Sequence, residues 1–248
     1  MFPILKRILY YFLPFTLLFF YIHSQFEKII SQSTINGLTG FYSVDALIFG
    51  LVVAFVINRE WENWFNLSES VQREINTIRE IWKWSDHAQE PMKTSMQNHL
   101  AGYLRALISE WKKGEKDVRS PVVDIELDNL RTQLAKGWPA VESLSIQLFG
   151  AYGNLIDARN RRLNFSRQHV PILLKRVVTA ADIILIILSL FVAVDNILLD
   201  YLFTGAITLM VFSLLLVVYD LDNPFKPGIW QITSEGYEAL LLELTGSK

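Results

Sequence analysis

The sequence contains no cysteine among its 248 residues. This absence excludes a disulfide framework, a cysteine-ligated zinc or iron–sulfur centre and a thiol nucleophile. An excess of basic residues is absent too, since 23 Lys and Arg residues stand against 25 Asp and Glu residues and give a formal net charge of −2. The chain therefore has no electrostatic footprint for nucleic acid.

Catalytic motifs are also absent. The sequence has no glycine-rich phosphate loop, no GxSxG elbow and no kinase signature. Its four histidines, His23, His87, His99 and His169, form no HExxH motif or other i,i+4 pair that would place two metal ligands on one helix face. We therefore expect no catalytic residue, no metal site and no cofactor.

Long apolar runs are what the sequence does have. Hydrophobic residues make up 51% of the chain and gather in two blocks, residues 1–58 and 171–221. A membrane-spanning helix needs about 20 predominantly apolar residues. The two blocks predict four such spans: Ile8–Ile22, Phe41–Asn58, Ile183–Val194 with an extension back to Val177, and Leu202–Tyr219. We expect a tight turn at Leu199, Asp200 and Tyr201 between the last two.

The positions of the basic residues predict the orientation in the membrane. Lys6 and Arg7 precede the first span, Arg59 follows the second, and Lys175 and Arg176 precede the third. Because cytoplasmic loops carry the excess of Lys and Arg, both termini and the central region are predicted to be cytoplasmic. The chain is thus expected to be a multi-pass protein of the cell membrane.

The central region has the three- and four-residue apolar spacing of helices and no strand alternation. The expected fold is therefore an all-α membrane protein with four transmembrane helices and a helical cytoplasmic domain. The organisation that follows is 1–58 (transmembrane helices 1 and 2), 59–170 (cytoplasmic domain), 171–221 (transmembrane helices 3 and 4) and 222–248 (a cytoplasmic turn and a short amphipathic helix).

Charged residues in unusual places are the remaining candidates for function. Asp45 and Asp182 interrupt apolar spans, where a charge costs on the order of 3 kcal/mol, so they face water, a pore or a cationic partner, or else lie at interfacial depth. Interfacial depth is favoured for Asp182, paired with Arg176 or Arg59. The five glutamates after the second span interleave with basic residues, which is typical of a solvated face. They are Glu60, Glu62, Glu69, Glu74 and Glu80.

Two arginines of the central region have two interpretations. Arg159 and Arg162 either bind a ligand or pair with acidic residues such as Glu80 and Asp157. Arginines on a cytoplasmic helix are more often structural ion-pair partners.

Two local strings carry a family resemblance. The second span and its exit, from Ile48-Phe49-Gly50-Leu51 to Asn58-Arg59-Glu60-Trp61, resemble the pore helix of bestrophin channels. Asn223-Pro224-Phe225, after the last span, resembles the turn that follows the last span in the same family. Together with shorter motifs between residues 41 and 225, their order is similar to that of the bestrophin-like group of prokaryotic membrane proteins.

The resemblance implies a homo-oligomeric ring of five subunits around a central ion pathway, with the lipid bilayer and a permeant inorganic ion as partners. Counting back from Arg59 by the family spacing puts Ser43, Leu47 and Leu51 at the narrow neck, on one helical face. Leucine rings would form a hydrophobic constriction that can gate by dewetting. Asn58, Arg59 and Trp61 mark the helix exit, and Asn223, Pro224 and Phe225 mark the C-terminal turn.

The sequence departs from the bestrophin pattern where the ion is selected. Bestrophin necks use aromatic side chains, whose electropositive edges can face anions, and leucine has no such edge. The acidic calcium-binding run after the turn is missing, so calcium gating does not carry over. The expected function is a bestrophin-like channel permeable to anions such as chloride. The alternatives are a cation-permeable channel with Asp45 at its mouth, a non-conducting scaffold whose cytoplasmic domain binds a partner, and a membrane enzyme using Asp45 and Asp182.

Overall fold

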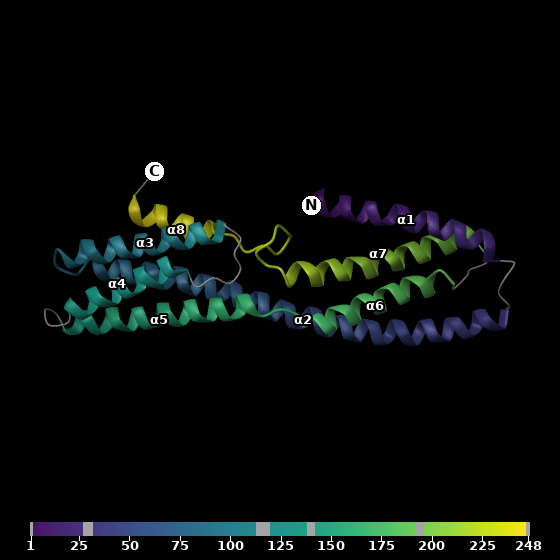
Figure 1. Cartoon of the computed structure of the whole chain (residues 1–248), viewed down its shortest axis with the longest axis horizontal. Coiled ribbons are helices and arrows are strands. Elements are labelled where there is room, and N and C mark those ends of the chain that lie inside the picture. Colours follow the sequence, from purple (N-terminus) through teal and green to yellow (C-terminus); the bar gives the residue numbers. More distant parts are fainter. Residues whose placement is uncertain (1, 27–31, 113–119, 138–141, 192–195, 247–248) are drawn as a thin grey trace. The chain divides into compact units, whose positions relative to one another are not determined.

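The computed structural model describes residues 2–26, 32–112, 120–137, 142–191 and 196–246, and all regular structure in these ranges is α-helical. This confirms the all-α fold class. The helices are α1 (Phe2–Phe26), α2 (Gln32–Ser85), α3 (Met92–Lys112), α4 (Pro121–Gly137), α5 (Glu142–Arg167), α6 (Ile172–Ser189), α7 (Ile197–Leu221) and α8 (Glu235–Thr245) (Figure 1).

The chain forms two compact units. Unit 1 comprises Met1–Trp61 and His169–Asn223, and unit 2 comprises Glu62–Gln168 and Pro224–Lys248. The long helix α2 contributes its first part to unit 1 and its second part to unit 2. Each unit has its own apolar core.

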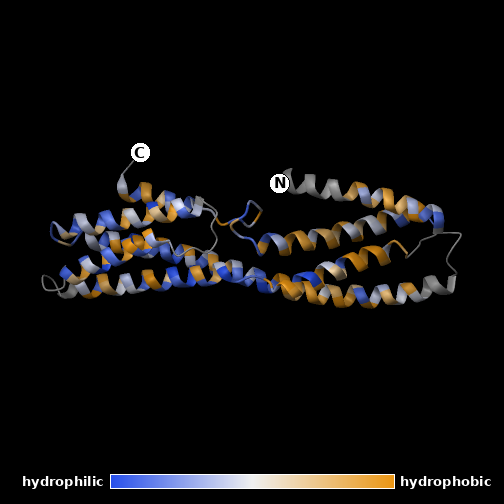
Figure 2. Ribbon diagram, in the orientation of Figure 1, coloured by the Kyte–Doolittle hydropathy of each residue, from blue (hydrophilic) through white to orange (hydrophobic). Residues whose placement is uncertain are grey.

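Unit 1 packs α1, α6, α7 and the first part of α2 along one another (Figure 1). Phe49, Val53 and Val56 of α2 are buried against apolar residues of α6 and α7. The helices of this unit are largely hydrophobic (Figure 2), and many of their large apolar side chains are exposed. Apolar residues on every side are the pattern of a helix bundle surrounded by other apolar material.

Unit 2 is a helical domain in which α3, α4, α5 and α8 pack with the second part of α2. Its polar residues alternate with apolar ones (Figure 2), and one cluster of apolar side chains is buried between its helices. The predicted amphipathic end of the chain is confirmed as α8, which packs on α3. Gly236 of α8 allows a close approach to α2, because a Cβ at this position would lie 2.8 Å from Cδ1 of Ile75.

The helix boundaries confirm some span predictions and correct others. The second predicted span and the amphipathic stripe after it form one helix, α2, and the chain leaves its last long helix at Leu221 as the Asp-Asn-Pro sequence predicts. Two helices, α2 and α7, are long and apolar enough to cross a membrane over their described residues, and the four spans stay a prediction. The helix α6 carries Lys175, Arg176 and Asp182, which reduces its apolar content.

The predicted turn at Leu199–Tyr201 is wrong. These residues form the first turn of α7, which begins at Ile197 because the side chain of Asn196 accepts hydrogen bonds from the backbone N–H groups of Leu198 and Leu199, at 3.0 and 3.3 Å. The helix α6 ends at Ser189 rather than at Val194. Residues 192–195, part of the third predicted span, lie outside the described residues.

Candidate functional site

The predicted neck residues form an exposed stripe on α2. Leu47 and Leu51 are both 65% exposed, and Ser43 lies one turn before Leu47 and is exposed as well. The Ser43 hydroxyl donates to the carbonyl oxygen of Thr39 at 2.9 Å, so it is occupied within its own helix. The stripe is therefore apolar in character, and the opposite face of α2 is the one that packs into the unit 1 core.

Asp45 does not lie on this stripe. Its side chain is half-buried, and Oδ2 is buried without a hydrogen-bond partner. Asp182 is similar, at 2% exposure with a buried, unpartnered Oδ1. Among the described residues Asp182 forms no ion pair with Arg59 or Arg176, so that expectation is wrong. Because Asp182 shares the buried face of α6 with Val178 and Leu185, its carboxyl is surrounded by the bundle.

At the exit of α2, exposed and buried residues alternate around the helix. Asn58 and Arg59 are exposed and Trp61 is 45% exposed, whereas Glu60 is only 2% exposed. Glu60 was predicted to lie on a solvated face, and this is wrong because its position is on the side of α2 that faces α6 and the end of α7.

The end of α7 is held by a buried carboxylate, Asp222, at 3% exposure. Its Oδ1 accepts from the backbone N–H of Val170 at 2.8 Å, and its Oδ2 accepts from the ammonium of Lys175. His169 lies beside it, with Nδ1 3.0 Å from the Asp222 carbonyl oxygen. Asp222 thus joins the end of α7 to the start of α6 by charge-assisted hydrogen bonds.

The predicted C-terminal turn is formed by residues with separate contacts. Asn223 donates from Nδ2 to the carbonyl oxygen of Tyr219 at 2.9 Å, closing the last turn of α7. The Pro224 carbonyl accepts from the backbone N–H of Ile232 at 2.7 Å, and the Phe225 ring packs edge-on against Trp111 with centroids 5.3 Å apart.

A second buried charged centre lies in unit 2. Glu74 of α2 is fully buried, and its Oε2 accepts from Nε of Arg162 on α5 at 2.5 Å. The hydroxyl of Tyr237 on α8 donates to the same Oε2 at 2.9 Å, and the hydroxyl of Tyr103 on α3 donates to Oε1. One carboxylate therefore connects four helices.

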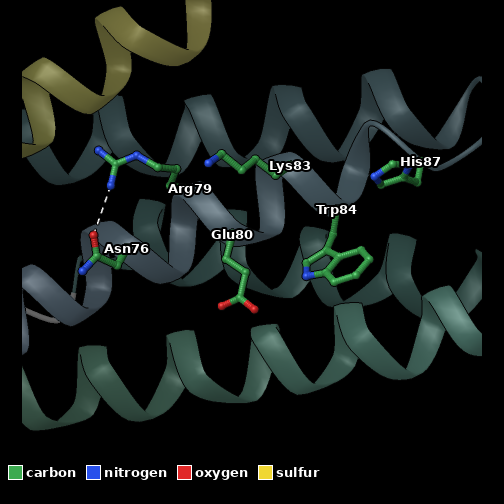
Figure 3. A pocket seen from close by; sticks show the side chains of 6 residues that line it. All are labelled: Asn76, Arg79, Glu80, Lys83, Trp84 and His87. Atoms are coloured by element: carbon green, nitrogen blue, oxygen red, sulfur yellow. Dashed lines mark hydrogen bonds between the residues drawn. The ribbon is translucent and has the colours of Figure 1, made fainter.

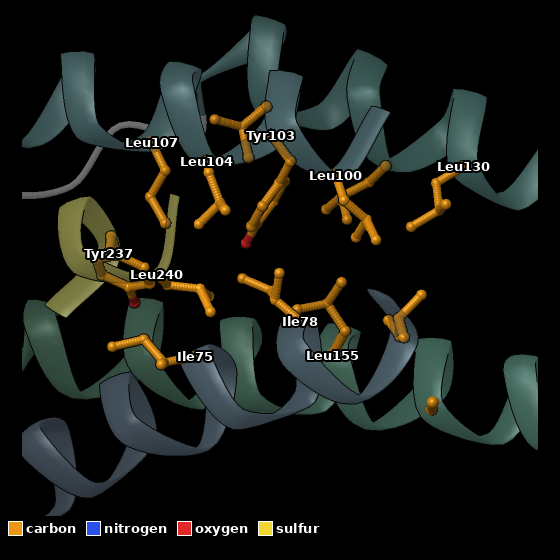
Figure 4. Close-up of a cluster of buried hydrophobic side chains, with 14 of the residues drawn as sticks. Ile75, Ile78, Leu100, Tyr103, Leu104, Leu107, Leu130, Leu155, Tyr237 and Leu240 are labelled. Carbon is orange, nitrogen blue, oxygen red and sulfur yellow. The ribbon is translucent and has the colours of Figure 1, made fainter. Parts of the chain in front are cut away.

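The electrostatics of this centre keep its partners in one protonation state. Burial and then the charge of Glu74 raise the pKa of Tyr103 and of Tyr237 well above 10. Burial opposes the charge of Arg162, yet Glu74 and the two tyrosines together raise its pKa above the usual value. The Arg162 guanidinium also lies over the Trp111 ring, 5.6 Å from the centroid. Figure 4 shows Tyr103 pointing from α3 into the apolar cluster around this centre.

The sequence analysis missed this centre because Glu74 was assigned to a solvated face. A signal was available, since Glu74 follows Val71 by three residues and adjoins Ile75 in the buried stripe of α2. For Arg159 and Arg162 the structural interpretation is confirmed with different partners. Arg162 pairs with Glu74, and Arg159 Nη2 lies 2.6 Å from Asp124 Oδ1.

A shallow groove of about 480 Å³ lies on unit 2, lined by Asn76, Arg79, Glu80, Lys83, Trp84 and His87 (Figure 3). Its charged groups do not converge, because Lys83 extends toward Arg79 whereas Glu80 points away from both (Figure 3). Arg79 is occupied by Glu243, with Nη2 to Oε2 at 2.9 Å. Within the described ranges, no three His, Asp or Glu side chains gather closely enough to hold a metal ion.

Comparison with known structures extends over the whole chain. A crystal structure of a bacterial bestrophin homolog from Klebsiella pneumoniae, carrying a point mutation, matches with a TM-score of 0.77 at 12% identity, covering 98% of this chain and 99% of that one. Another structure of that homolog matches with a TM-score of 0.67 at 13% identity, covering 99% of each chain. A crystal structure described as a membrane protein gives 0.78 at 12% identity, covering both chains fully.

At such low identity these structures show the fold alone. No curated protein matches the chain. The sequence itself, however, matches the family model described as a Bestrophin-like domain over residues 10–237. The family resemblance predicted from the α2 and Asn-Pro-Phe motifs is confirmed. The chain belongs to the Bestrophin-like family.

Proposed function

We propose that this chain is one subunit of a bestrophin-like, homo-oligomeric ion channel of the cell membrane, with α2 lining the ion pathway. The observation that carries the proposal is the exposed stripe of Ser43, Leu47 and Leu51 on a helix whose other face is packed. An apolar face of this kind must be covered by lipid or by further copies of the chain. A ring of copies, five by analogy with bestrophins, would turn the stripe toward a central axis.

In this arrangement Leu47 and Leu51 form the constriction. Rings of leucine side chains narrow a pore without offering a polar partner to an ion, so water leaves the constriction when its radius falls. Asn58, Arg59 and Trp61 lie at the cytoplasmic end of the predicted span, beyond which α2 continues to Ser85. The proposed topology has four spans, both termini in the cytoplasm and unit 2 as the cytoplasmic domain.

The charge of the permeant ion, negative or positive, is proposed from the family resemblance. Bestrophin resemblance favours chloride, although the leucine neck has no electropositive edge for an anion. A cation-permeable channel is the second candidate. Asp45 lies off the stripe of Ser43, Leu47 and Leu51, but its carboxyl would repeat around the ring and attract cations at the mouth of the pathway.

Recording from the purified protein in a planar bilayer under a potassium chloride gradient tests the proposal. We expect unitary currents with a reversal potential shifted toward the chloride equilibrium potential. A shift toward the potassium potential would establish the cation channel instead. Reproducible silence across voltage and pH, combined with capture of a stoichiometric soluble partner by unit 2, would overturn the channel in favour of a membrane scaffold.

A further inference from the structure

Glu60 is a buried carboxyl without a complete set of partners. It is 2% exposed, and its Oε2 is shielded from solvent and forms no hydrogen bond. The apolar run of α2 ends before Arg59, so Glu60 lies just beyond the predicted span. A buried ionised carboxylate that lacks partners is strongly disfavoured.

The groups around Glu60 come from three elements, and all belong to unit 1. The negative charge of Asp222, at the end of α7, raises the pKa of Glu60, whereas the positive charges of Arg59 of α2 and Lys175 of α6 lower it. His169, just before α6, lies against Asp222 rather than providing a hydrogen bond to Glu60.

Lys175 cannot neutralise two carboxylates at once. Its ammonium donates to Oδ2 of Asp222, whose Oδ1 is held by the Val170 backbone N–H. Arg59 is exposed, so water screens its charge. Ionised Glu60 would therefore be a negative charge without a full counter-charge. It would lie beside Asp222, whose own negative charge is already paired with Lys175. A proton is the ligand that removes this conflict.

We propose that Glu60, beside Asp222 and Lys175, forms a proton-binding site that couples pH to the packing of α2 against α6 and the end of α7. The protonated site keeps the three elements together, and loss of the proton sets Glu60 against Asp222 and loosens α2. That this site faces the cytoplasm and acts on an ion pathway rests on the proposed function, whereas proton binding does not.

The direction of the pH effect follows from the pKa. Burial, followed by the charge of Asp222, raises the pKa of Glu60 from its ordinary 4.5 to about 7. The folded protein therefore retains a proton that the unfolded chain has already released. Stability from this site is fully present below pH 4.5, falls as pH rises through 7, and is absent above about pH 8.

Thermal unfolding of the full-length protein in detergent, at pH 6 and at pH 8, tests the site without requiring ion flux. We expect the Tm of the wild type to fall by about 3–5 °C over this interval through Glu60 alone. Glu60→Gln should remove that fall. Glu62→Gln is the matched control, because Glu62 is exposed two residues further along the same helix, and it should retain the fall.

His169 lies against Asp222, so its contribution is tested separately with His169→Gln, which should leave most of the pH dependence in place. The proposal would be overturned if the Tm of Glu60→Gln fell between pH 6 and pH 8 as much as that of the wild type, or if this fall were lost only in His169→Gln. If Glu60→Gln does not fold, infrared spectra of the wild type with 13C-labelled glutamate replace it. A protonated glutamate band at pH 6 that is lost at pH 9 is expected, and a fully ionised spectrum at pH 6 would contradict the site.

These readouts separate the proton site from the channel. A protein that does not conduct ions but shows the expected pH-dependent Tm would refute only the proposed function. A protein that conducts ions but whose Tm does not depend on pH through Glu60 would refute only the proton site.

Discussion

The two units treat their buried carboxylates in opposite ways. In unit 2, Glu74 receives hydrogen bonds from an arginine and two tyrosines, so both of its oxygens are occupied. In unit 1, Asp45, Glu60 and Asp182 each keep a buried oxygen without a partner. Asp222 alone among the buried carboxylates named here for unit 1 is held by an ammonium and a backbone N–H.

This difference indicates what each unit needs. Unit 2 buries most of its large apolar side chains and satisfies its central charge, as a self-sufficient helical domain does. Unit 1 leaves many large apolar side chains exposed and several carboxyls incomplete within a single chain. Its completion therefore requires lipid, protons, water or neighbouring copies, which is consistent with the proposed oligomeric channel.

The largest effect is expected when Glu74 loses its charged partner, because unit 2 then also holds a buried carboxylate without a counter-charge. Arg162→Met should cost about 3–5 kcal/mol of unfolding free energy, because it leaves a buried carboxylate without its counter-charge. Thermal or denaturant unfolding of the full-length protein measures this loss. Arg161→Met is the control, since Arg161 is exposed and pairs only with Asp157 one turn away at 2.9 Å, and should change stability by less than about 0.5 kcal/mol. Equal losses in both variants would mean that the buried centre does not stabilise unit 2.

In unit 1, replacing a buried carboxyl is expected to raise the unfolding free energy instead of lowering it. Asp182→Leu replaces a buried, unpartnered carboxyl among apolar residues and should raise stability by about 1–3 kcal/mol. The same unfolding assay detects it as a higher Tm. A marked loss of stability would instead show that the assembled protein provides Asp182 with a partner. A stabilised but non-conducting variant would identify the carboxyl as functional.

The contribution of α8 to unit 2 can be tested by a change with a smaller expected effect than Arg162→Met. Tyr237→Phe keeps the ring in the core but removes its hydroxyl from Glu74, and should cost about 1.5–3 kcal/mol. Hydrogen exchange should show faster amide exchange in α8. The helix α4 is the internal reference, because the hydrogen bonds to Glu74 among the described residues come from α3, α5 and α8. Unchanged exchange in α8 would mean that this helix is held by its apolar contacts alone.

Much of the fold could be predicted because apolar periodicity is a local property of the sequence. The helical spacing of Leu67, Val71, Ile75 and Ile78 identified the second part of α2, and two prolines with a glycine identified the break after α7. The turn before α7 was placed too late because Leu199 and Tyr201 continue the apolar run, while the start of the helix is set by one Asn196 side chain.

The buried centres could not be predicted with the same success, because burial of a charged residue depends on what the opposite helix supplies. Glu60 and Glu74 occupy inward positions of α2, yet their neighbours in sequence include the exposed Glu62 and Glu69. Arg162, which pairs with Glu74, lies 88 residues further along the chain. Asp222, whose negative charge acts on Glu60, lies about 160 residues further along. The exposed stripe of Leu47 and Leu51 was accessible from sequence because helical spacing alone places them on one face.

Because the chain has no native cysteine, accessibility of single introduced cysteines tests the central claim that α2 lines an ion pathway most directly. Leu51→Cys and Phe203→Cys replace side chains that are 65% and 59% exposed in the single chain, on α2 and α7 respectively. During planar-bilayer recording, a charged, water-soluble thiol reagent should rapidly and irreversibly reduce the current of Leu51→Cys and leave that of Phe203→Cys unchanged. Insensitivity of Leu51→Cys, with conduction intact and Phe203→Cys modified instead, would contradict the account.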